Sequence, residues 1–80
     1  MTEFYYHGSI FQVRQEGNRH RVLYLGETVG FYRRMGDRWF ANPLYSMYGQ
    51  SPYASDEHGV RELIAAATVQ RGVAELAIAA

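Results

Sequence analysis

The chain has 80 residues, of which 48% are hydrophobic and 15% are Phe, Tyr or Trp, so it can bury one core and has no room for a second. It contains no cysteine, which excludes disulfide bonds, thiolate nucleophiles and sulfur metal sites. Eight basic residues, all of them arginine, balance eight acidic residues. The chain as a whole therefore carries no net charge that would draw it to nucleic acid or to an anionic membrane.

The sequence has no apolar run of the ~20 residues that a membrane-spanning helix needs. Its first residues, Met-Thr-Glu-Phe-Tyr-Tyr, lack the basic region of a secretory signal peptide. Small secreted domains often depend on disulfide bonds, and this chain can form none. We therefore expect a soluble, cytoplasmic protein.

Residues 1–42 predict an antiparallel sheet of three or four strands. Aromatic and β-branched residues are frequent over residues 4–15, where Gly8 indicates a bulge. The further strands are expected over residues 20–25, 28–35 and 38–42. Glycine-containing turns separate these segments, and short strands joined by such turns are typical of a meander.

Residues 43–54 hold two prolines and three tyrosines and predict a long, irregular loop. A helix is expected over residues 55–71, with Ser55 as its N-cap and two acidic residues in its first turn. Apolar residues at helical spacing, Val60, Leu63, Ile64 and Ala67, form one stripe along it. Arg71 and Gly72 are typical of a helix end.

The apolar tail, residues 72–80, is compatible with a second short helix, a continuation past Gly72 or an edge strand. The whole chain is thus expected to form a single α+β domain, with the main helix packed on one face of the sheet.

Alternation along the strands assigns their side chains to two faces. The face expected to pack on the helix carries Phe11, Val13, Leu23, Leu25, Val29, Phe31, Met35, Trp39 and Ala41. The opposite face is expected to carry Gln12, Arg14, Val22, Tyr24, Tyr32, Arg34, Arg38 and Phe40. Trp39 and Phe31 are accordingly predicted to be buried beneath the helix.

An exposed sheet face that interleaves arginine and tyrosine has three interpretations. The residues can stabilise the sheet through cross-strand pairs, form a protein-binding hot spot, or stack unpaired bases and neutralise phosphates. Binding to a protein or protein complex is the leading functional hypothesis, because the zero net charge disfavours nucleic acid. The predicted contact residues are Arg14, Tyr24, Tyr32, Arg34, Arg38, Tyr45 and Tyr48.

Nothing in the sequence predicts catalysis. Asp56, Glu57 and His58 resemble an acid–base cluster but fit the acidic first turn of a helix better. His7 and His20 show no metal-ligand spacing with each other or with His58, and no glycine-rich phosphate loop is present. We therefore expect a protein that is not an enzyme and that has no cofactor and no metal site.

In its length, its lack of cysteine and its sheet-plus-helix layout, the chain resembles small proteins of phages and other mobile elements, including anti-CRISPR inhibitors. No sequence motif is shared, so no residue role is carried over. The resemblance implies an accessory or inhibitor protein that binds a host macromolecular complex. The alternatives are a small nucleic-acid-binding sheet protein and a structural homodimer built on the apolar tail, with Leu76 and Ile78 at its interface.

Overall fold

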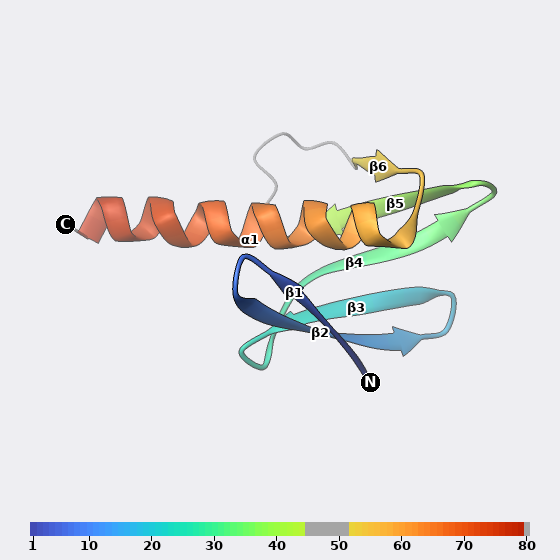
Figure 1. The fold of residues 1–80 in the computed structure, drawn as a ribbon, viewed down its shortest axis with the longest axis horizontal. Coiled ribbons are helices and arrows are strands. Elements are labelled where there is room, and N and C mark those ends of the chain that lie inside the picture. Colours follow the sequence, from blue (N-terminus) through green and yellow to red (C-terminus); the bar gives the residue numbers. More distant parts are fainter. Residues whose placement is uncertain (45–51, 80) are drawn as a thin grey trace.

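A computed structural model describes residues 1–44 and 52–79, with side chains as far as Val69. They form one six-stranded antiparallel sheet, with the strands in sequence order, and one helix (Figure 1). The elements are β1 (Thr2–Tyr6), β2 (Ser9–Glu16), β3 (Arg19–Tyr24), β4 (Glu27–Met35), β5 (Arg38–Pro43), β6 (Tyr53–Ala54) and α1 (Glu57–Ala79). The expected α+β class with an antiparallel meander sheet is confirmed, but the described residues form six strands rather than three or four.

The additional strands come from two segments that the sequence pattern assigned differently. Residues 4–15 do not form one bulged strand, because His7 and Gly8 make a two-residue turn that pairs Tyr6 with Ser9. Both turn residues have positive φ, +49° and +84°, as the tight turns of β-hairpins require. The sixth strand, β6, lies within the segment expected to be a loop and pairs with β5.

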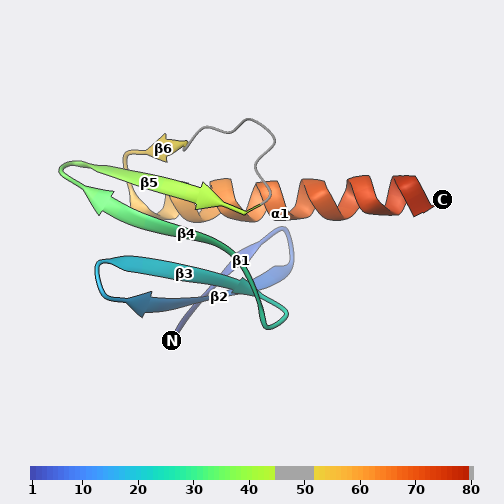
Figure 2. The same cartoon turned by 180° about the vertical axis from the view of Figure 1, so that it is seen from behind.

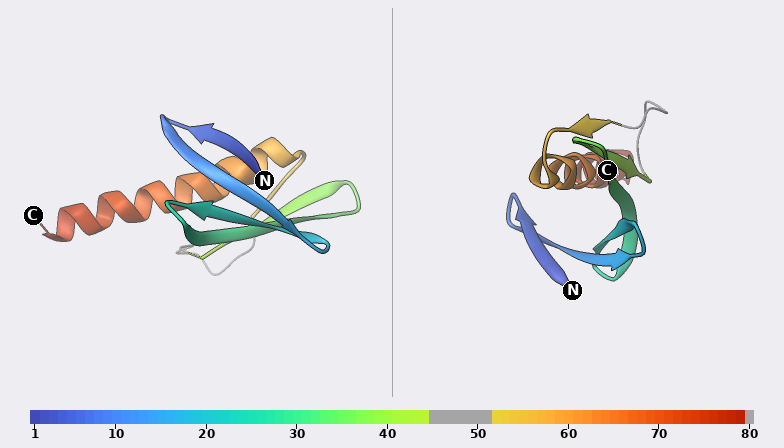
Figure 3. Two further views of the ribbon diagram at one scale, coloured as in Figure 1. Left: turned by 90° about the horizontal axis from the view of Figure 1, so that it is seen from below. Right: turned by 90° about the vertical axis from the view of Figure 1, so that its right-hand side faces the viewer.

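The sheet is curled, and α1 lies along its concave face (Figure 3). The helix contacts β4 and β5 most extensively and also reaches β1 and β6, at the two edges of the sheet. The buried core joins residues of five elements, namely Phe11, Val13, Val22, Val29, Tyr32, Ala41, Val60, Ile64 and Ala65. The concave side of the sheet is thus filled by the helix.

Gly30 is a point at which the helix and β4 approach closely. A Cβ atom at this position would lie 2.9 Å from Ile64 Cγ2 and 3.2 Å from the Asn42 carbonyl oxygen. Any larger residue would force the helix away from β4 or distort the pairing with β5. Because successive strand residues alternate between faces, Gly30 on the concave face places Phe31 on the convex one.

The face assignment made from the sequence is right for β2 and β5. In β3 and β4 it is wrong for most residues, although Leu23 and Val29 are buried as expected, with 8% and 3% of their surfaces exposed. Phe11 and Val13 are buried, and Trp39 is half-buried against the core. Val22 in β3 and Tyr32 in β4, which were expected on the opposite face, are fully buried, with 0% and 1% of their surfaces exposed.

Three residues that were expected on the face beneath the helix lie elsewhere. Phe31 is not beneath the helix but half-buried on the convex face, and Met35 is 50% exposed. Leu25 is 84% exposed because it occupies a two-residue turn with Gly26, in which both φ values are positive. In β3 the neighbours Val22 and Leu23 are equally apolar, so this pair did not define the inward face, although Arg19 and Arg21 share the side of Leu23 and indicate the exposed face.

The helix also begins and ends at other residues than expected. Asp56 rather than Ser55 is the cap, since its Oδ1 accepts a hydrogen bond of 2.7 Å from the backbone N–H of Gly59. At the other end α1 continues through Gly72 to Ala79. The predicted end at Arg71 is therefore wrong, and of the three conformations left open for the tail the continuation past Gly72 is the one observed. The second half of α1 extends beyond the sheet (Figures 1 and 2). Within the described part of the chain, no helix combines the length and apolarity needed to cross a membrane.

A partly buried polar network fixes Tyr32 on the concave face. The Tyr32 hydroxyl donates to Glu57 Oε2 at 2.8 Å and accepts from Arg61 Nε at 3.0 Å. Arg61 also pairs with Glu57 at 3.2 Å, and its guanidinium carbon lies 5.5 Å from the centroid of the Phe4 ring. One tyrosine of β4 is therefore connected to the first turns of α1 and, through Arg61, to β1.

The Tyr32→Phe substitution should lower the free energy of unfolding by about 1–2 kcal/mol, because it removes two hydrogen bonds at a buried position. Tyr5→Phe is the matched control, since Tyr5 is 70% exposed and its hydroxyl can bond to water. Chemical denaturation of the two variants and the wild type at neutral pH gives the comparison. Equal stability of the two variants would show that the network does not hold the helix on the sheet.

The same substitution has a predicted pH dependence. Burial raises the pKa of Tyr32 to about 12 from an ordinary value of 10.0, with the hydrogen bond from Arg61 opposing the rise. The unfolded chain therefore ionises this tyrosine first, and the wild type should lose stability as the pH rises from 10 towards 12. The stability difference between wild type and Tyr32→Phe should narrow over that range, as measured by denaturation at several alkaline pH values.

Candidate functional site: the outer face of the sheet

The convex side of the sheet, which we call the outer face, is rich in arginine and aromatic side chains. In an antiparallel sheet, residues directly opposite each other on neighbouring strands point to the same face. The pairs Arg14↔Arg21, Arg21↔Phe31 and Arg33↔Phe40 therefore extend across β2, β3, β4 and β5 on this side. The arginines of the outer face are Arg14, Arg19, Arg21, Arg33 and Arg38. Its aromatic residues are Phe31, Phe40 and Tyr53, together with Tyr5 on the edge strand β1.

A single carboxylate lies among three of these arginines. Glu16 Oε2 accepts a hydrogen bond of 2.8 Å from Arg21 Nε, while Arg14 and Arg19 approach the same carboxylate at 4.0 Å. Arg21 also donates to Thr28 Oγ1 at 2.8 Å. The hydrogen bond from Arg21 holds the pKa of Glu16 below its ordinary value against the opposing effect of burial, and the three positive charges lower it further. The cluster keeps an excess of positive charge, because three guanidinium groups share one carboxylate.

The aromatic rings hold several guanidinium groups against the sheet. The Arg19 and Arg21 guanidinium carbons lie 4.1 and 5.0 Å from the centroid of the Phe31 ring, and Arg38 lies 5.0 Å from that of Tyr53. These are cation–π distances. The contacts order long side chains that would otherwise lose much entropy on binding a partner.

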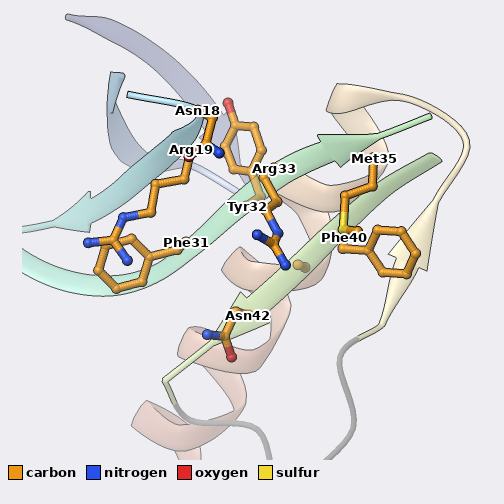
Figure 4. A pocket seen from close by; sticks show the side chains of 9 residues that line it. Asn18, Arg19, Phe31, Tyr32, Arg33, Met35, Phe40 and Asn42 are labelled. Atoms are coloured by element: carbon orange, nitrogen blue, oxygen red, sulfur yellow. The ribbon is translucent and has the colours of Figure 1, made fainter. Parts of the chain in front are cut away.

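A hollow of about 260 Å³ opens on the outer face beside this cluster (Figure 4). The rings of Phe31 and Phe40 line it, Arg19 and Arg33 contribute guanidinium groups, and Asn42 contributes a side-chain amide. Arg33 and Phe40 are paired across β4 and β5, so the sheet register itself brings a cation and a ring together here.

Charge is distributed unevenly over a chain whose net charge is zero. Strand pairing places two carboxylates on the outer face, Glu3 and Glu16, against the five arginines. The segment of residues 55–80 has the reverse balance, with four acidic residues and two arginines. The positive potential of the protein is therefore concentrated on the side of the sheet opposite the helix.

The structure separates the predicted contact residues into three groups. Arg14 and Arg38 lie on the outer face, as expected. Tyr24, Tyr32 and Arg34 belong to the concave side, so their expected place on the exposed face is wrong.

Tyr24, Tyr32 and Arg34 each have local contacts on the concave side. The Tyr24 ring stacks on Phe11 with centroids 4.8 Å apart, Tyr32 is buried, and Arg34 donates to the Gly36 carbonyl oxygen at 2.9 Å. Tyr45 and Tyr48 lie outside the described residues, as do the side chains of Leu76 and Ile78.

Sequence reasoning missed Arg19, Arg21 and Arg33 as site residues. Arg19 and Arg21 alternate with His20 and follow a glycine turn. Their place on one common face could therefore have been predicted, had the orientation of β3 been assigned correctly. Because the orientation of β3 and β4 was predicted wrongly, Arg34 and Tyr32 were predicted as site residues in place of Arg33 and Phe31.

The residues weighed as an acid–base cluster or as metal ligands have other contacts. Asp56 caps the helix, Glu57 bonds to Tyr32, and His58 Nε2 lies 3.1 Å from Glu62 on the exposed side of α1. His20 stacks on Tyr32 with ring centroids 4.6 Å apart. Among the side chains that the structure describes, no three His, Asp or Glu residues are grouped as metal ligands would be.

Fold and site together define a small α+β protein in which a helix fills the concave side of a curled meander sheet and the convex side presents an arginine–aromatic surface. Comparison of the chain with protein-family models, with curated proteins and with solved structures finds no match. The proposal of a function therefore depends on the chemistry of the outer face.

The Glu16→Gln substitution should destabilise the protein at neutral pH, because it replaces a carboxylate held by three arginines. The lowered pKa of Glu16 means that its contribution is present above the ordinary carboxylate pKa and is lost as the pH falls through the lowered value. The melting-temperature difference between wild type and Glu16→Gln should therefore be larger at pH 7 than at pH 3. Glu27→Gln, at an exposed position and in none of the ion pairs of the described side chains, is the control, and an equal effect of the two variants would contradict the cluster.

Proposed function

We propose that this protein is a non-catalytic binding protein whose outer face contacts an anionic macromolecular partner. The observation that carries the proposal is the charge of that face, where five arginines lie with two carboxylates. Guanidinium groups bind carboxylate and phosphate oxygens in a bidentate manner. Their cation–π contacts with Phe31 and Tyr53 hold them in place before a partner binds, which lowers the entropic cost of association.

The corrected face assignment changes the kind of partner that fits. A protein-binding hot spot of tyrosine and arginine needs Tyr24 and Tyr32 at the surface, whereas both belong to the concave side. The side chains that replace them outside include Arg21, Arg33 and Phe31. The exposed surface is therefore more cationic than the sequence pattern indicated, and this supports a partner with an anionic surface.

The resemblance to phage and mobile-element proteins suggests which kind of binding protein this is. On this proposal the protein is an accessory or inhibitor protein of the anti-CRISPR type that binds an anionic surface of a host complex, in the cytoplasm and without catalysis. The structural homodimer is a separate proposal, supported by the part of α1 that extends beyond the sheet (Figure 2). Sedimentation as a monomer at high concentration would exclude the homodimer.

Arg33 and Arg34 provide a matched test of the outer face. They are neighbours with the same charge, but Arg33 pairs with Phe40 on the outer face while Arg34 pairs with Trp39 on the other. Titration of two labelled polyanions, an oligothymidylate and poly-L-glutamate, at several salt concentrations measures binding of each variant.

Arg33→Ala should weaken binding and reduce the log–log salt slope on the oligonucleotide by about 0.7, the value for one phosphate contact on a single strand. Arg34→Ala should leave both quantities close to those of the wild type. Equal effects of the two substitutions, or no binding to either polyanion at about 50 mM salt, would contradict the proposed function.

A further inference from the structure

The hollow on the outer face has a chemical character that a merely cationic surface lacks. Phe31 and Phe40 present rings on its walls, Arg19 and Arg33 add guanidinium groups, and Asn18 and Asn42 add two side-chain amides (Figure 4). An anionic group alone would use the guanidinium groups and leave the rings and amides without a function. A ligand that uses all three must combine negative charge, a flat apolar face and hydrogen-bonding edges.

The size of the hollow limits what can enter it. Its volume is about 260 Å³, slightly below the roughly 300–1,000 Å³ of pockets that enclose a drug-sized ligand. One planar ring system fits that space, whereas a helix or a strand of a partner protein does not. A nucleobase has the required flat face and polar edges, and the phosphates on either side of it supply the charge.

The surroundings of the hollow match a chain of phosphates. Arg19, at its rim, also approaches Glu16, and through that carboxylate the hollow borders the cluster of Arg14 and Arg21. On the other side, Met35 at the edge of the hollow pairs with Arg38. Positive charge thus flanks the hollow in both directions across the sheet, as a strand that inserts one base and continues both ways would require.

We propose that this hollow is a base-binding subsite for single-stranded nucleic acid, in which Phe31 and Phe40 contact the base, Asn42 bonds to its edge, and Arg19 and Arg33 bind the adjoining phosphates. The inference rests on the proposed function, because it specifies the anionic partner of the same surface. A duplex does not fit this role, since its bases are stacked and paired in the interior of the helix. An acidic protein does not fit it either, since carboxylate side chains carry no ring to fill the hollow.

The test compares three probes with two variants of the hollow and one matched control. The probes are a labelled oligothymidylate, a duplex of the same length and poly-L-glutamate, titrated at low salt by fluorescence anisotropy. Phe40→Ala removes a ring that lines the hollow, and Asn42→Ala removes an amide at an exposed position, where loss of folding is not expected. Tyr5→Ala is the control, because Tyr5 is an exposed aromatic residue of β1 outside the hollow.

The subsite predicts that the oligothymidylate binds more tightly than either other probe. Phe40→Ala should weaken its binding about 5- to 150-fold, the range that loss of one base–aromatic stack gives. Asn42→Ala should weaken oligothymidylate binding to a smaller extent, and Tyr5→Ala should not affect it. Circular dichroism shows whether Phe40→Ala is folded, and if it is not, Asn42→Ala decides the question alone.

The opposing outcomes separate the two proposals. Equal binding of oligothymidylate and poly-L-glutamate, tighter binding of the duplex, or no effect of Phe40→Ala and Asn42→Ala would overturn the subsite. Each of those results leaves the anionic-partner function in place as long as binding still depends on Arg33. Failure of all three probes to bind would overturn both.

Discussion

The contact between Gly30 and Ile64 determines which side of the sheet becomes the surface. A Cβ at Gly30 would lie 2.9 Å from Ile64 Cγ2, so the helix can lie this close to β4 only where no side chain intervenes. With Gly30 on the concave side, the two-residue period of the strand places Tyr32 there as well and turns Phe31 and Arg33 outwards. The Tyr32 hydroxyl then meets Glu57 and Arg61 at the start of α1, which fixes the same orientation a second time.

The orientation of β4 determines which side chains lie on the outer face. Cross-strand pairing brings arginines of β2, β3 and β4 beside one another and beside Phe31 and Phe40, so their charges add on one surface. Glu16 binds three of the guanidinium groups without neutralising them all, and this limits the repulsion between neighbouring arginines such as the Arg14↔Arg21 pair. A chain of zero net charge thereby acquires a polarised surface, and net charge was a poor guide to the partner.

The sequence predicted local features well and the long-range ones poorly. The turns at Gly17-Asn18 and Gly36-Asp37, the core positions in β2 and β5, and the α+β meander all follow from local pattern and turn chemistry. The inward face of β3 was assigned wrongly because Val22 alternates with an equally apolar Leu23, although Arg19 and Arg21 share the side of Leu23 and indicate the exposed face. The orientation of β4 depends on Gly30 beneath Ile64 and on the bond from Tyr32 to Glu57, 25 residues further along the chain, and such contacts have no local signal. Arg21, Arg33 and Phe31 were consequently missed as site residues.

The orientation of β4 is the central claim, and nuclear Overhauser effects measure it directly. Gly30 lies against Ile64, so its α protons should show cross-peaks to the Ile64 γ2 methyl group, and the Tyr32 ring should show them to the side chain of Arg61. Phe31 should instead show cross-peaks to Arg19 and none to the helix. Cross-peaks between the Phe31 ring and the Ile64 methyl groups, with none from Gly30, would mean that β4 is inverted, and the arginine–aromatic outer face would then not exist.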